Sequence, residues 1–333
     1  MRRKTGSSKG AIELSLTYVY AVLIGIVIFI VATRVIGVQS MSADEQNTRT
    51  LLNAFDEIVQ ASAQDPNLIQ QIDVPQANIQ FVWDDQTRIR IGRYSSLIWL
   101  PVFSEARLGS TISAWTYPYR IDAASSPLLF LSDGTMRYFI SNLTPSAEGV
   151  RRDIFSETPR NAGTYGLSIG QQTAFTVAGR NLCIRHAHDT NWYSCKVRLV
   201  SSRAPYGYLS WNDDRWYPVS SYGEIFAALF STGERDWVSA IATAHARDTI
   251  NREVLMRRTD LFDGFDPICD TFYSQARGNL SVVASELTVM RDPAPVVPAD
   301  IDLDTFIPLR SALANLSAID RELTRSDCPA VVG

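Results

Sequence analysis

The chain of 333 residues is long enough for about two folded domains. Hydrophobic residues make up 46% of it and charged residues 20%, which excludes a disordered, collagen-like or polytopic membrane protein. The formal net charge of −4 argues against a nucleic-acid-binding protein, because such proteins are usually basic. We therefore expect no nucleic acid among its partners.

An apolar run near the N-terminus predicts where the protein lies. Residues 14–33 carry no charged side chain, and twenty helical residues span about 30 Å, the thickness of the hydrocarbon core of a bilayer. The leader at residues 1–10 is basic, and little positive charge follows the run. The positive-inside rule therefore predicts a single transmembrane helix over residues 11–37, with a cytoplasmic N-terminus and residues 38–333 outside the cell membrane. The lipid bilayer is then an expected partner.

The junction between the leader and the apolar run carries a short motif. It reads Ser8-Lys9-Gly10-Ala11-Ile12-Glu13-Leu14, a basic leader that ends in Lys-Gly with an acid just inside the apolar segment. This resembles the class III signal of archaeal type IV pilin-like proteins. The resemblance implies processing at Lys9, Gly10 and Ala11 by a prepilin-type peptidase, with cleavage after Gly10. It also implies an assembly role for Glu13, whose carboxylate would neutralise the new α-amino group of a neighbouring subunit. The resemblance covers only about residues 1–37, and an uncleaved signal anchor remains the alternative.

Beyond the apolar run the sequence first shows a helical and then an alternating pattern. The apolar stripe within residues 42–65 predicts an amphipathic stalk helix over 38–66. From residue 67 the period changes to two, which predicts an antiparallel β domain over 67–220. Hairpins are expected for residues 79–83 with 87–91, 128–131 with 136–140, and 206–211 with 215–219. Further strands are expected at 173–177 and 195–200, and a long polar loop at 145–170.

After residue 220 the period is helical and predicts a helical domain over 221–333. Ser231 and Glu234 match a capping box at the start of a helix over 233–258. The apolar stripe of this helix is expected to contain Trp237, Ile241, Ala244, Ile250 and Val254. Two more helices are expected at 270–291 and 303–325, and we expect them to form an antiparallel hairpin around the proline-rich segment 292–298.

Four cysteines lie in the part of the chain predicted to be exported. If the last two helices are antiparallel, the start of one meets the end of the other, which brings Cys269 to Cys328. Cys183 is then left with Cys195, across a local β excursion. The sequence therefore predicts two disulfides, Cys183–Cys195 and Cys269–Cys328, as expected in an oxidising compartment.

Three motifs suggest chemistry without meeting its structural requirements. Gly166–Gly170 matches a nucleophile elbow around Ser168, but that elbow needs a buried strand before it and a helix after it, and neither is predicted here. His186 and His188 are weak candidates for metal ligands, because two ligands are too few for a site. His245 is expected to pack on its helix or face solvent. We therefore expect no catalytic residue, no metal, no cofactor and no enzyme.

A run of aromatic residues between 206 and 237 has two interpretations. An exposed ladder of such side chains could bind a sugar or a protein partner. The favoured interpretation is that they fill the seam between the β domain and the helical domain. The residues concerned are Tyr206, Tyr208, Trp211, Trp216, Tyr217, Tyr222, Phe226, Phe230 and Trp237.

Together these features predict an α+β fold: a transmembrane helix extending into an amphipathic stalk, an antiparallel β domain, and a helical domain with an antiparallel helix hairpin. The first functional hypothesis is a membrane-anchored, surface-exposed pilin-like structural protein. It would be a minor subunit of an extracellular filament or envelope assembly, and its partners would be copies of itself or other pilin-like subunits. The alternative is a monomeric, membrane-anchored extracellular binding module, and an exported hydrolase or metalloenzyme is the weakest hypothesis.

Overall fold

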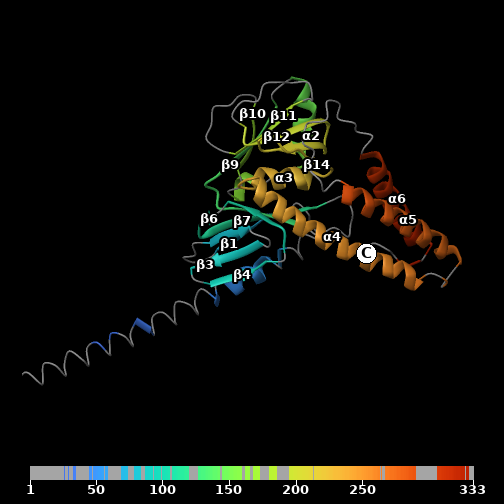
Figure 1. Cartoon of the computed structure of the whole chain (residues 1–333), viewed down its shortest axis with the longest axis horizontal. Coiled ribbons are helices and arrows are strands. Elements are labelled where there is room, and N and C mark those ends of the chain that lie inside the picture. Colours follow the sequence, from blue (N-terminus) through green and yellow to red (C-terminus); the bar gives the residue numbers. More distant parts are fainter. Residues whose placement is uncertain are drawn as a thin grey trace, which may run out of the picture.

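The computed structural model of the protein combines a β-rich body with a projecting helical arm (Figure 1). It describes Ile26, Phe29, Thr33 and Arg34 and most of the chain between residues 45 and 329. The described ranges from residue 45 onward are 45–46, 48–55, 57–58, 69–73, 79–83, 87–92, 94–98, 100–105, 107–119, 127–142, 145–159, 162–165, 168–172, 180–185, 195–212, 214–262, 264, 267–289, 306–326 and 328–329.

The predicted fold class needs two corrections. The first concerns the predicted transmembrane helix: among the described residues no helix is both long and apolar enough to cross a membrane. Of residues 11–37, where that helix was predicted, only Ile26, Phe29, Thr33 and Arg34 are described. The longest described helix, α4 (Glu234–Phe262), carries ten charged side chains, at its start and throughout its second half. The second correction concerns the β domain, which is not simply antiparallel, because two of the three described sheets contain parallel pairs.

Three sheets form the body. The first sheet is mixed and runs β1-β7-β8-β5, and the second is antiparallel and runs β4-β3-β2-β6. The third sheet is mixed and runs β10-β9-β11-β12-β13-β14. The strands are β1 (Ile69–Asp73), β2 (Ile79–Trp83), β3 (Thr87–Ile91), β4 (Tyr94–Leu97), β5 (Val102–Ser104), β6 (Arg107–Leu108), β7 (Thr111–Pro118), β8 (Pro127–Ser132), β9 (Arg137–Asn142), β10 (Ser168–Gln172), β11 (Arg180–Arg185), β12 (Val197–Arg203), β13 (Tyr206–Ser210) and β14 (Tyr217–Val219).

Two of the three expected hairpins are present and one is wrong. β2 pairs with β3, and β13 with β14, both antiparallel. β8 and β9 do not pair, because β8 already lies between β7 and β5, whereas β9 pairs in parallel with β10 and β11. The turn at Asp133 and Gly134 instead carries the chain from the first sheet to the third. Asp133 accepts hydrogen bonds from the backbone N–H groups of Thr135 and Gly109, both at 3.0 Å, which fixes this crossing.

The segment expected to be a long loop contains a helix. α2 (Glu148–Ser156) lies within residues 145–170 and buries Val150, Arg151 and Ile154. A 3₁₀ turn, η1 (Pro145–Ala147), precedes α2, and a second, η2 (Ala162–Tyr165), follows it. The polar composition of this segment predicted a loop. Val150 and Ile154, however, are four residues apart, so in a helix both side chains lie on the face that packs on the core.

The predicted capping box is also wrong in its position. Ser221 and Glu224 form the capping box, at the start of α3 (Tyr222–Phe230), a short helix that is almost completely buried. Ser231 ends α3 instead, and its Oγ donates a hydrogen bond to the carbonyl oxygen of Ala227 at 2.7 Å. The same residue pattern occurs at both positions, so the pattern alone did not distinguish them.

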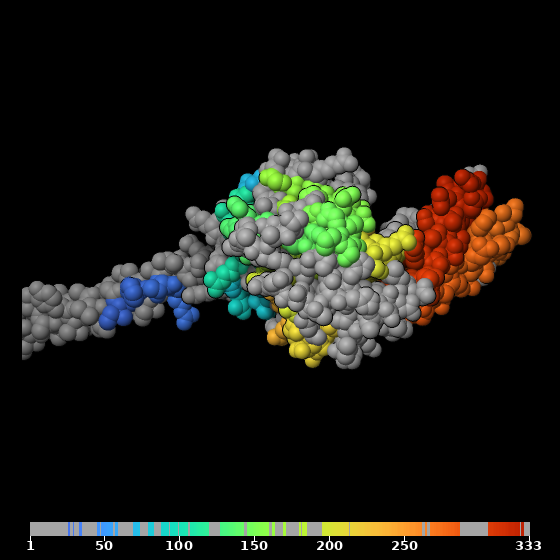
Figure 2. All heavy atoms as spheres, turned by 90° about the horizontal axis from the view of Figure 1, so that it is seen from above, coloured from blue at the N-terminus to red at the C-terminus, as the bar shows by residue number. Residues whose placement is uncertain are grey.

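The described residues form two separate hydrophobic cores. The larger lies between the sheets, α2, α3 and the first half of α4, and it also takes in Leu51, Phe55 and Ile58 from the described helical residues of the expected stalk. The smaller lies between α5 (Pro267–Val289), α6 (Ile307–Arg325) and Leu255 of α4. Figures 1 and 2 show α5 and α6 projecting beyond the body, with α4 leading out to them. We call α5, α6 and the second half of α4 the arm.

Candidate functional site

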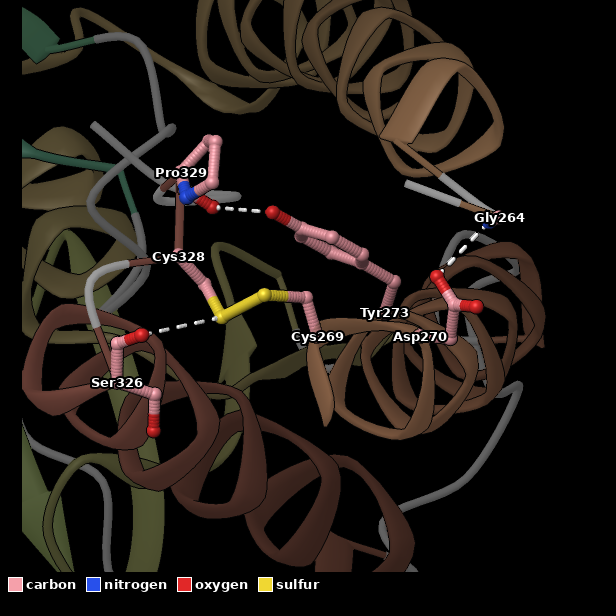
Figure 3. Close-up of a disulfide and its surroundings, with 7 residues drawn as sticks. All are labelled: Gly264, Cys269, Asp270, Tyr273, Ser326, Cys328 and Pro329. Carbon is pink, nitrogen blue, oxygen red and sulfur yellow. Dashed lines mark hydrogen bonds between the residues drawn. A yellow bond between two sulfur atoms is a disulfide. The ribbon is translucent and has the colours of Figure 1, made fainter. Parts of the chain in front are cut away.

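The far end of the arm is closed by a disulfide. Cys269 lies in the first turn of α5 and Cys328 just beyond α6, and the two are bonded (Figure 3). The Tyr273 hydroxyl donates to the carbonyl oxygen of Pro329 at 2.9 Å, and the backbone N–H of Gly264 donates to Asp270 Oδ1 at 2.8 Å. The chain after α6 and the turn between α4 and α5 are therefore both fixed to the start of α5.

The rest of the arm is held by apolar packing and by an ion pair between α4 and α5. The small core contains Leu280 and Val283 of α5 against Leu316 and Leu323 of α6. Arg277 of α5 lies 2.6 Å from Asp260 of α4, which ties the two helices together near the tip. At the other end, the ring of Phe306 packs on Tyr206 and Tyr208 of the third sheet, with centroid distances of 5.3 and 6.3 Å. The arm is thus anchored to the body at its base and stapled at its tip.

An open groove of about 670 Å³ runs between α5 and α6. Its apolar lining includes Phe272, Val282 and Ile319, and Glu322 is its one charged lining residue. A Cβ at Gly278 would meet no atom within 4 Å, so the space beside this residue is open. The complete lining is Phe272, Gln275, Gly278, Asn279, Val282, Asn315, Ala318, Ile319 and Glu322.

A row of apolar side chains on α4 faces solvent. Ile250 is 60% exposed, Val254 49% and Leu261 78%, and Val238 is 38% exposed at the other end of the row. Ala242 and Ala246 are exposed between them. Ile250 and Val254 were expected on the buried stripe, and this expectation is wrong, because α4 leaves the body after Ala244 and presents only part of its circumference to α5. We call Val238, Ala242, Ala246, Ile250, Val254 and Leu261 the ridge.

A buried polar cluster joins the first and third sheets. Glu105, which is buried after β5, accepts hydrogen bonds from the Tyr138 hydroxyl at 3.1 Å and from Thr135 Oγ1 at 3.3 Å. Burial raises the pKa of Glu105, and the neighbouring negative charge of Asp133 raises it further. Arg180, buried nearby on β11, donates through Nη1 to the carbonyl oxygen of Phe230 at the end of α3. Glu105, Tyr138 and Arg180 are buried, so their arrangement supports a structural role between the sheets and α3.

The raised pKa of Glu105 predicts a pH dependence of stability. A carboxyl group whose pKa is higher in the folded state stabilises the fold below its unfolded pKa, and this stabilisation is lost as pH rises through the folded pKa. We therefore expect the free energy of unfolding of the wild type, relative to Glu105→Gln, to fall as pH rises above about 4.5. Urea denaturation at a series of pH values measures this difference.

Glu148 supplies the contrast for this measurement. Its pKa is lowered by the hydrogen bond from Arg151, so Glu148→Gln should give the opposite slope against the wild type. Curves for Glu105→Gln and the wild type that stay parallel with pH would contradict the assignment.

The structure answers the expectations on the cysteines and the aromatic run. Disulfides are confirmed, and they join Cys183 to Cys195 and Cys269 to Cys328. Most of the aromatic residues lie in the core rather than in an exposed ladder. Trp216, Phe226 and Phe230 are fully buried, and Trp237 packs on Trp211 and Tyr217.

Of the residues weighed for catalysis or metal binding, the structure describes Ser168 and His245, and these lie on separate elements. Ser168 begins β10, at the edge of the third sheet, and no elbow between a strand and a helix forms around it. His245 lies within α4, and His186 and His188 fall outside the described residues. In the described part of the chain no three His, Cys, Asp or Glu side chains are placed to hold a metal ion. Nothing in these residues indicates an enzyme.

The residues expected to be processed, Lys9, Gly10 and Ala11, and the assembly residue Glu13 lie outside the described residues. Sequence reasoning did not identify the Glu105 cluster, the groove or the ridge. Of these three features only the ridge could have been recognised in the sequence, from the four-residue spacing of Val238 to Val254.

Comparisons with protein-family models, curated proteins and solved structures found no match.

Proposed function

We propose that the protein is an exported, surface-exposed pilin-like structural subunit of an extracellular filament or envelope assembly. The observation that carries this proposal is the disulfide-stapled arm, which projects from the body and carries two exposed surfaces, the ridge and the groove. Disulfides persist mainly outside a reducing cytoplasm, and both cysteine pairs are bonded. A projecting element with exposed apolar side chains is typical of a surface made for contact with another molecule.

The N-terminal motif indicates how such a subunit would be processed and exported. Processing after Gly10 by a prepilin-type peptidase would release Ala11 as the new N-terminus, with Glu13 as the third residue of the mature chain. The leader would remain in the cytoplasm and residues 38–333 would be extracytoplasmic. The partners would be copies of the chain or other pilin-like subunits.

The state of the N-terminus in cells tests this proposal. Mass spectrometry of the purified protein should show a chain that begins at Ala11, and sheared surface material should sediment at high speed. Glu13→Ala should remove the protein from that sediment, whereas Glu13→Asp, which keeps the carboxylate, should retain part of it. An intact leader, or sedimentation that does not change in Glu13→Ala, would contradict the proposal.

The groove favours a second candidate function, a monomeric extracellular binding module. Gln275, Asn279 and Asn315 place carboxamide groups beside its apolar lining, as in sites that hold a small polar ligand. A protein that stays monomeric at all concentrations and shows no sedimenting form would favour this candidate over the first.

A further inference from the structure

We infer that the ridge on α4 of one copy docks into the groove between α5 and α6 of a second copy. The inference deepens the proposed function, because it names the surfaces through which subunits of one kind would meet. It depends on three features of the arm: the exposure of the ridge, its match in length to the groove, and the charges that the two surfaces carry.

The ridge has the form of a helix face made for packing. Its members follow one another at four-residue intervals from Val238 to Val254, so they form one of the oblique rows by which helices pack against each other. Ile250, Val254 and Leu261 are 49–78% exposed, although α4 is fixed at both ends by the body and by α5. Within one copy, these three side chains stay in contact with water.

The groove fits the outer part of this ridge in length and character. From Ile250 to Leu261 the helix rises about 16 Å, and from Phe272 to Val282, which line the groove, α5 rises about 15 Å. The apolar lining of the groove can receive the apolar anchors, as grooves that bind amphipathic helices do. The missing side chain at Gly278 leaves room for the incoming helix.

The charges favour this occupant. Arg257 is exposed between Val254 and Leu261, and Glu322 is the one charged residue that lines the groove. Glu322 lies 2.7 Å from Arg325, but the Arg325 side chain is 74% exposed and that of Glu322 47%. Surface ion pairs of this kind contribute little to stability, so Glu322 can exchange its partner. A basic residue in the ridge thus meets an acidic residue in the groove.

This contact would produce a chain of subunits rather than a closed dimer. The two surfaces differ, so each bound pair keeps one free ridge and one free groove, and further copies can add. A contact about 16 Å long is smaller than a standard stable interface, which takes about 800 Å² from each partner. We therefore expect weak association in dilute solution and strong association where many subunits are held together.

The first experiment measures association of the purified full chain in mild detergent by sedimentation velocity over a wide concentration range. The wild type should form dimers and larger species as concentration rises. Ile250→Glu on the ridge and Gly278→Trp in the groove should each weaken this association at least tenfold. Ile268→Glu, which changes an exposed isoleucine outside both surfaces, and Gly278→Ala, which leaves the groove open, are the matched controls and should behave like the wild type.

Mixing the two blocked variants gives the sharper test. Ile250→Glu keeps its groove and Gly278→Trp keeps its ridge, so the mixture should form a one-to-one dimer and nothing larger. Arg257→Glu and Glu322→Arg should each weaken association, and the double variant should recover it to within a few fold, because the charges are exchanged between copies.

Several outcomes would overturn the inference. These are a wild type that stays monomeric at the highest concentration, a groove variant that associates normally, or a mixture that gives no dimer. If the ridge variant alone prevents dimers, then two ridges pair with each other and the inferred contact is wrong. Filaments that still form with both arm variants would overturn this contact and leave the proposed function intact. If the arms pair in a protein whose leader is never cleaved, the inferred contact stands and the proposed function is contradicted.

Discussion

Replacing both Cys269 and Cys328 with alanine should destabilise the arm by about 4 kcal/mol. The bond joins residues 59 apart in the sequence, and the loop-entropy model gives a stabilisation of this size for a loop of that length. Among the described residues, the smaller core of the arm has 12 buried residues, both cysteines among them, against 44 in the larger core, so the disulfide contributes a larger share of its stability. Hydrogen exchange followed by mass spectrometry should show faster exchange in α5 and α6 and little change in the body.

The second disulfide provides the control. Cys183 and Cys195 are only 12 residues apart, and for such a loop the same model predicts about 3 kcal/mol. Replacing this pair with alanine should speed exchange in β11 and β12 and leave α5 and α6 unchanged. If both double variants gave the same pattern over the whole chain, the arm and the body would unfold as one unit.

The helices of the arm could be predicted because local pattern decides them. The apolar side chains of α5 and α6 recur at three and four residues, and Pro293 lies in the segment between them, where a helix cannot continue. The predicted ranges 270–291 and 303–325 therefore agree closely with Pro267–Val289 and Ile307–Arg325. The positions of Cys269 and Cys328 follow from an antiparallel hairpin, so the pairing could be derived from the same pattern.

The sheets could not be predicted to the same depth. Alternating residues predict that a segment is a strand, but the choice of its neighbour depends on contacts distant in sequence. Asp133 and Gly134 show this, because they form the turn expected of a hairpin and yet join strands of two different sheets. β5 and β7 pair with the two edges of β8, so β9 cannot pair with it, and the local sequence does not show this.

The ridge and the Glu105 cluster could not be predicted for a similar reason, because both depend on the arrangement of distant parts of the chain. Ile250 and Val254 have the composition and spacing of core residues, and only the departure of α4 from the body makes them exposed. Glu105 looks like an ordinary surface acid in the sequence. Its burial depends on Tyr138 and Arg180, which lie more than thirty residues away in the chain and come from two other strands.

Trp115→Ala should be the most damaging single change in the body. The Trp115 indole is fully buried on β7, and its ring lies 4.9 Å from that of Phe130 and 5.0 Å from that of Phe226. It therefore joins the first sheet to α3. Truncating a buried tryptophan removes its apolar contacts and leaves a cavity, which costs about 3–5 kcal/mol. Urea denaturation of the wild type and the variant measures the loss.

Trp115→Phe separates the packing of the ring from its polar atom. Trp115 Nε1 is buried without a hydrogen-bond partner among the described residues, so phenylalanine removes an unsatisfied donor while it keeps an aromatic ring in the gap. We expect Trp115→Phe to cost much less than Trp115→Ala. An equal loss in both variants would mean that the indole N–H has a partner in solution. It would also mean that packing between the first sheet and α3 contributes less to stability than the ring distances imply.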